Sequence, residues 1–95
     1  MTAALIVKHR VADFAHWKKV FDSMTPLRKQ HGWLGHTVLR DAQDPNVVTV
    51  VNRVKDLDGA KRYGGSAELK NAMKDAGVQG PPEISFLENA DDLTY

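Results

Sequence analysis

The apolar residues of the chain alternate with polar ones in some segments and recur every three or four positions in others. Alternation over Ala3–Val11, Trp33–Arg40 and Val47–Val54, and again over residues 83–88, predicts four strands. A stripe at helical spacing follows the first strand, and Asp13 is placed to cap a helix that begins at Phe14. The stripe consists of Phe14, Trp17, Val20, Phe21, Met24 and Leu27.

Prolines and glycines indicate where these elements break. Pro26 predicts a kink or a restart of the first helix, with Thr25 as its cap, and Gly32 suits a left-handed stop. A second helical region is predicted in two pieces. The first piece begins at Asp56 or Asp58, runs through Tyr63 and is interrupted by Gly64-Gly65. The second piece is capped by Ser66 and ends at Gly77. Gly80-Pro81-Pro82 predicts a rigid turn before the last strand.

The order strand, helix, strand, strand, helix, strand predicts one domain over residues 1–95 with an α+β, ferredoxin-like split sheet and both helices on one face. In the hairpin closed by Asp44-Pro45-Asn46, strict alternation assigns two faces. The face expected under the helices carries Trp33, Gly35, Thr37, Leu39, Val48, Val50, Asn52 and Val54. The open face carries Leu34, His36, Val38, Arg40, Val47, Thr49, Val51 and Arg53. Because the open face is half apolar, we expect a second copy to cover it and form a homodimer.

Composition narrows the classes of function without naming one. Of the 95 residues, 13 are Lys or Arg and 12 are Asp or Glu, so the charge is too balanced for a general nucleic-acid binder. The chain has no Cys, which excludes disulfides, thiol chemistry and zinc fingers. Its apolar runs are too short to span a membrane, and its start does not match a signal peptide, so we expect a cytoplasmic protein.

Several segments together resemble the dimeric α+β-barrel superfamily, and within it the small proteins labelled "cyclase" or antibiotic biosynthesis monooxygenase-like. The matching segments are Lys8-His9-Arg10-Val11-Ala12-Asp13-Phe14, Trp17-Lys18, Val20-Phe21-Asp22, Gly32, Asp44-Pro45-Asn46, Asp56-Leu57 and Gly80-Pro81-Pro82-Glu83. The resemblance implies a dimeric barrel with a cavity between sheet and helices. The superfamily contains cofactor-free monooxygenases, haem-degrading oxygenases, isomerases and proteins without a known reaction, so the fold alone does not indicate which function this chain has.

The haem-degrading branch is disfavoured residue by residue. The resemblance implies an Asn, a Trp and a His at the positions that carry His9, Val54 and Tyr63 here. All three differ, and no cofactor is expected.

The cofactor-free branch needs a base that works near neutral pH, donors for a developing anion and a dry aromatic slot. His9 shares strand parity with Leu5 and Val7 and is the candidate base. His36 and Asn52 are candidate donors, and Arg28 is a candidate partner for an anion at the cavity rim. Trp17, Phe21 and Tyr63 are candidate walls. Structural alternatives stay open for most of these residues. They are a hydrogen-bonded interface position for His9, an interface or solvent-facing strand position for His36, core packing for Trp17 and Phe21, and a solvated helix position for Arg28.

No metal site is expected, because His9, His31 and His36 show no ligand spacing. The sequence therefore leaves two hypotheses. One is a cofactor-free monooxygenase or cyclase that acts on a small aromatic or polyketide-like compound. The other is a non-catalytic dimeric module that binds a metabolite or a protein partner.

Overall fold

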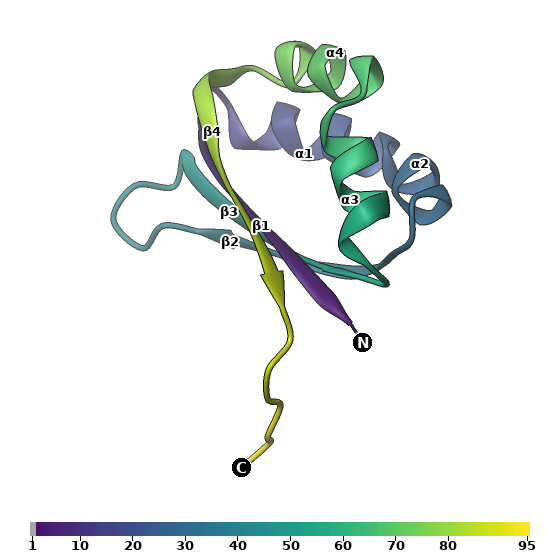
Figure 1. The fold of residues 1–95 in the computed structure, drawn as a ribbon. Coiled ribbons are helices and arrows are strands. Elements are labelled where there is room, and N and C mark those ends of the chain that lie inside the picture. The colour runs from purple at the N-terminus through teal and green to yellow at the C-terminus, as the bar shows by residue number, and fades with distance from the viewer. Residues whose placement is uncertain (1) are drawn as a thin grey trace.

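A four-stranded sheet carries all the helices on one of its faces (Figure 1). The computed structural model describes residues 2–95. In chain order the elements are β1 (Ala3–Val11), α1 (Phe14–Ser23), α2 (Thr25–Gln30), β2 (Trp33–Arg40), β3 (Val47–Val54), α3 (Leu57–Gly64), α4 (Ala67–Asp75) and β4 (Val78–Glu88). The strands run antiparallel in the order β2-β3-β1-β4. This arrangement confirms the predicted α+β, ferredoxin-like fold of the single chain.

Local capping explains where the helices begin. The carboxylate of Asp13 accepts a hydrogen bond from the amide of Ala15. Asp56 caps α3, which decides between the two predicted start points, and the Ser66 hydroxyl caps α4 by accepting from the amide of Leu69. Each cap satisfies an amide that the helix itself leaves unpaired.

The first helical region breaks beside Pro26, but one residue earlier than expected. Met24 is the N-cap residue of α2, and Thr25 is already helical instead of being the cap. Met24 has no side-chain acceptor, so α2 starts without a side-chain cap and directly continues from α1. Gly32 ends the segment with φ 91°, in the left-handed region that was expected for it.

A β-bulge changes which face the residues of β2 occupy. Trp33 pairs with Val54, yet Gly35 already pairs with Arg53, so Leu34 is one extra residue in the strand. Beyond the bulge, His36, Val38 and Arg40 pair with Asn52, Val50 and Val48 and share the helix-covered face. Gly35, Thr37 and Leu39 are on the open face. The predicted faces of β2 were therefore wrong after Trp33, because strict alternation does not survive an inserted residue.

Strand β4 is longer than predicted. It begins at Val78 rather than at residue 83, and the Gly80-Pro81-Pro82 segment lies inside the strand. The pairing with β1 shifts between Lys8 and Arg10, and Gly80 has φ 76°. Two adjacent prolines are tolerated there because β4 is an edge strand and residues 80–82 are skipped in its pairing with β1, so neither proline has to donate an amide to a partner strand.

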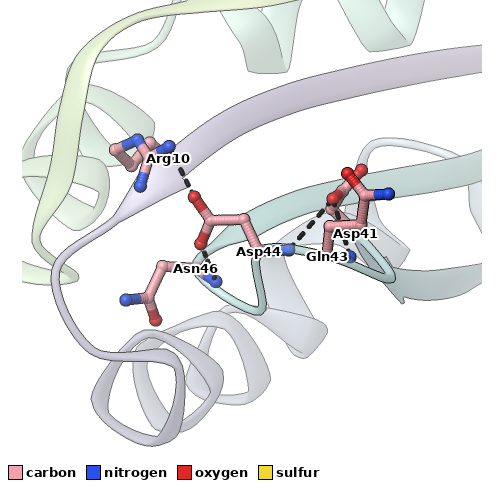
Figure 2. Close-up of polar contacts among 5 residues, drawn as sticks. All are labelled: Arg10, Asp41, Gln43, Asp44 and Asn46. Carbon is pink, nitrogen blue, oxygen red and sulfur yellow. Dashed lines mark hydrogen bonds and ion pairs between the residues drawn. The ribbon is translucent and has the colours of Figure 1, made fainter.

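The turn between β2 and β3 is fixed by two aspartates (Figure 2). One carboxylate oxygen of Asp41 accepts hydrogen bonds from the amides of Gln43 and Asp44. Asp44 accepts from the Asn46 amide and forms an ion pair of 2.6 Å with Arg10 of β1. The hydrogen bond from Arg10 and that from the Asn46 amide lower the pKa of Asp44. This confirms the predicted turn and ties the hairpin to the central strand.

Two groups of buried side chains lie between the sheet and the helices. One gathers around Leu5, Trp33, Val54 and Tyr63, and the other around Val11, Trp17, Val48 and Val50. Within residues 2–95, no helix is long and apolar enough to cross a membrane.

Candidate functional site

A cavity of about 250 Å³ lies between the helices and the covered face of the sheet. Its floor comes from β1, β3 and β4 together with Trp33 of β2, and its walls come from all four helices. Both core groups contribute to it, so the aromatic residues of the core leave the space open instead of filling it. The candidates that line it are His9, Trp17, Phe21, Arg28, Asn52 and Tyr63. A cavity of about 150 Å³ holds benzene, so this one suits a compact molecule of two or three fused rings.

His9 lies near the end of β1, where the alternation from Leu5 and Val7 carries its side chain to the cavity. The residue is only 7% exposed, and no group of residues 2–95 hydrogen-bonds either of its ring nitrogens. Burial lowers the pKa of His9, so the ring is neutral at neutral pH. A neutral imidazole with a free nitrogen can accept a proton from a molecule in the cavity.

Trp17 and Phe21, one helical turn apart on α1, stack with ring centroids 4.8 Å apart. The Trp17 ring also lies 5.5 Å from the His9 ring. On the other side, the Arg28 guanidinium carbon lies 3.9 Å from the centre of the Phe21 ring, which is cation–π distance. The contacts Arg28–Phe21–Trp17–His9 form a continuous row along one side of the cavity, which we call the aromatic row.

Arg28 is buried more deeply than the sequence suggested. It is 5% exposed, so it lies within the wall and not at the rim. Its guanidinium donates one hydrogen bond, of 3.1 Å, to the Thr25 hydroxyl. Burial lowers the pKa of Arg28, while Tyr63 and Asp22 oppose that shift.

Tyr63 of α3 faces the cavity at the same end as Arg28. Its ring packs edge-on against Trp33, with centroids 5.0 Å apart. The hydroxyl lies near the Arg28 guanidinium without reaching good hydrogen-bond geometry, and it has no other partner within residues 2–95. Burial raises the pKa of Tyr63, and the charge of Arg28 opposes that rise, so the phenol stays protonated at neutral pH.

Asn52 is largely engaged within the fold. Its side-chain oxygen accepts a hydrogen bond of 2.8 Å from the Trp33 indole, and its amide donates one of 3.0 Å to the Leu5 carbonyl. One amide hydrogen remains for a ligand. The geometry therefore makes Asn52 first a support for Trp33 and only secondarily a donor.

His36 lies on the covered face because of the bulge at Leu34, but it does not line the cavity. Its ring meets Phe21 edge-on, with centroids 4.9 Å apart, and so stands behind the aromatic row. Burial lowers the pKa of His36, and the nearby Arg28 and Lys18 charges add to this shift. The ligand-donor role expected for His36 has no direct geometric support.

Sequence analysis missed part of the lining. Ile84 and Phe86 of β4 border the cavity, and Lys61 of α3 lies 5.7 Å from the Phe86 ring. Alternation within β4 already places Ile84 and Phe86 on one face, but nothing local shows which face is covered. Across the part of the chain that the structure describes, no cluster of three His, Asp or Glu side chains could hold a metal ion.

No protein-family model matches the chain, and no curated protein sequence does. Solved structures do match over nearly its whole length. The cofactor-independent oxygenase SnoaB from Streptomyces nogalater has a TM-score of 0.79 at 16% identity, covering 99% of this chain and 98% of its own. The monooxygenase ActVA-Orf6 from Streptomyces coelicolor, solved with nanaomycin D, has a TM-score of 0.69 at 20% identity, covering 98% and 91%.

A further structure, named antibiotic biosynthesis monooxygenase, has a TM-score of 0.70 at 10% identity and covers 94% of this chain and 99% of that one. At these identities the likeness concerns the fold. The chain therefore has the ferredoxin-like fold of the antibiotic biosynthesis monooxygenases.

Proposed function

We propose that this chain binds a small aromatic molecule in the cavity and oxidises it with dioxygen, with His9 as the base and without a cofactor. The observation that carries the proposal is the His9 ring, which is buried, neutral, without a hydrogen bond to either nitrogen from residues 2–95, and adjacent to an apolar cavity. A buried imidazole without a partner costs folding free energy, so its place at a cavity calls for a role there. Two of the structural neighbours, a cofactor-independent oxygenase and a monooxygenase, support the same chemistry.

The chemistry follows from a substrate with an acidic CH₂ group beside aromatic rings, as in an anthrone. His9 removes one proton from that carbon, and the resulting carbanion adds dioxygen to form a peroxide. The imidazolium returns the proton to the peroxide. Loss of water then breaks the O–O bond and removes the second hydrogen, so CH₂ and O₂ become C=O and H₂O. The substrate supplies all four electrons.

A second candidate is a non-catalytic module that holds a similar molecule. The engagement of Asn52 with Trp33 and Leu5 favours it, because it leaves few donors to stabilise an anion near His9. Binding without oxygen consumption would identify this candidate.

We further propose that the chain works as a cytoplasmic homodimer joined through the open face of the sheet. That face carries half-buried Ile6, Val47 and Val51 beside exposed Leu39 and Leu87, which are 49% and 42% exposed. Val38, first expected in this patch, lies under the helices instead, and Leu39 takes its place. A contiguous apolar surface of this kind is stabilised when a second copy covers it.

The direct test uses anthrone as the probe, with binding followed by quenching of Trp17 and Trp33 fluorescence and turnover by an oxygen electrode. We expect saturable binding and oxygen consumption above the protein-free rate. His9→Gln, which keeps a polar side chain of similar size but cannot act as a base, should bind anthrone and lose the oxygen consumption. Binding without turnover in the unchanged protein would favour the second candidate. Absence of binding would refute both.

A further inference from the structure

Arg28 is a buried cation that has no anionic partner within residues 2–95. At 5% exposure it makes one hydrogen bond, to the neutral Thr25, although a guanidinium offers five donors. The ion pairs found within residues 2–95 join Arg10 to Asp44 and Lys18 to Asp22, and neither includes Arg28. Asp22 is the acidic residue whose charge reaches Arg28, but Lys18 holds it at 2.6 Å.

The surroundings of Arg28 do not replace the missing anion. The Phe21 ring covers one face of the guanidinium and supplies only a cation–π contact. Tyr63 is a protonated phenol and carries no charge to neutralise it. A buried arginine is normally paired with a carboxylate or phosphate, because an unpaired buried charge is strongly unfavourable. The remaining donors of Arg28 therefore fit a charged group that enters from the cavity.

We propose that the molecule bound in the cavity carries a carboxylate, which Arg28 holds with help from the Tyr63 hydroxyl. This inference rests on the proposed function, since it concerns the same cavity, and it adds the chemical class of the ligand: an aromatic acid.

The acid group binds at the end of the cavity away from His9. Tyr63 packs with Leu5 and Trp33 near the start of β1, whereas His9 lies toward the end of that strand. Successive separations along the aromatic row are 3.9 Å from Arg28 to Phe21, 4.8 Å from Phe21 to Trp17 and 5.5 Å from Trp17 to His9. A flat molecule beside the row places its acid on Arg28 and its far ring beside His9. Arg28 thereby fixes which part of the ligand meets the base.

Two naphthalene probes of equal ring size test the assignment. In 6-hydroxy-2-naphthoic acid the hydroxyl and the carboxylate stand at opposite ends of the rings, and 2-naphthol lacks the carboxylate. Dissociation constants from fluorescence titration give the ratio of the two affinities. We expect the unchanged protein to prefer the acid by about 10-fold or more, the scale of a hydrogen bond to a charged group.

Variants assign that preference to Arg28. Arg28→Met keeps an unbranched apolar stem and should bring the affinity ratio close to one, whereas Arg28→Lys keeps the charge and should retain part of the preference. The matched control is Arg62→Met, because Arg62 is exposed on α3 and does not line the cavity. It should leave the ratio unchanged. Melting temperatures with each probe provide a second measurement, since the acid should stabilise the unchanged protein more than Arg28→Met.

The outcomes separate this inference from the proposed function. Equal affinities for the two probes in the unchanged protein would overturn the carboxylate assignment and leave an aromatic-binding cavity in place. A preference that persists in Arg28→Met would also overturn it. If neither probe binds, the aromatic-binding cavity itself is refuted and the assignment falls with it.

Discussion

The two faces of the sheet are made by the same strands, yet they differ in which kind of side chain is left without a partner. The covered face holds His9 and, above it, Arg28 and Tyr63, which are buried polar groups without adequate partners in the described part of the chain. The open face holds the apolar side chains of Ile6, Val51 and Leu39, which lack cover. The covered face thus lacks polar partners, and the open face lacks apolar cover. The comparison supports the two proposals, of a polar aromatic ligand on one face and an apolar partner on the other.

The largest expected effect comes from placing a charge on the covered face. Val48 is 0% exposed, and Val48→Asp should lower the free energy of unfolding by about 3–5 kcal/mol, because the carboxylate would be buried without a partner. The neighbouring Thr49→Asp places the same charge on the open face, opposite Lys8. At protein concentrations low enough to dissociate the proposed homodimer, it should cost less than about 0.5 kcal/mol, because the carboxylate then stays in water. Urea unfolding followed by circular dichroism measures both. Similar losses in the two variants would mean that the faces do not differ as described.

The dimer prediction tests the open face directly. Val51→Lys should abolish the homodimer, because the ammonium would be buried between two sheets, while each chain keeps its fold. Light scattering should give twice the chain mass for the unchanged protein and one chain mass for the variant. A monomer before any substitution would refute the paired-sheet assembly. Circular dichroism controls for loss of the fold.

An intermediate effect is expected at Asn52, which supports the covered face from within. Asn52→Ala removes the partner of the Trp33 indole and one of the bonds to the Leu5 carbonyl. It should lower the free energy of unfolding by about 1–3 kcal/mol, the range for leaving a buried polar group unpaired. The adjacent Arg53→Ala, on the open face and exposed, serves as the control in the same thermal melts. Equal melting temperatures for the two variants would contradict the supporting role of Asn52.

The smallest effect concerns pH. Burial lowers the pKa of His9 in the folded chain below the ordinary value of 6.5. As pH falls below 6.5, His9 takes up a proton in the unfolded chain before it does so in the folded chain. His9 therefore makes the free energy of unfolding decrease as the pH falls. His36, whose pKa is also lowered, acts in the same direction. Melting temperature should therefore fall between pH 7 and 5, and less so in His9→Gln. This window lies above the titration of Asp44, whose pKa is lowered from 3.8. An identical pH dependence in the variant would show that His9 is not desolvated.

The fold was readable from the sequence because its signals are local. Alternation predicted the exact bounds of the strands Trp33–Arg40 and Val47–Val54. Asp13 and Ser66 indicated where helices begin, because each accepts a hydrogen bond from an amide two or three residues away. The position of His9 in the cavity followed from parity with Leu5 and Val7. The inference about His9 was correct because β1 is paired regularly with β3, so its successive side chains alternate between the two faces without interruption.

Only the tertiary structure decided what depends on segments far apart in the chain. The extra residue at Leu34 reversed the faces of β2, moving His36 and Val38 under the helices, and single-residue alternation cannot reveal such an insertion. The engagement of Asn52 required Trp33, 19 residues away, and Leu5, 47 residues away, to meet. The burial of Arg28 without a carboxylate is likewise a property of the assembled wall. Periodicity fixes the direction of a side chain, but whether a polar group finds a partner depends on every element that packs around it.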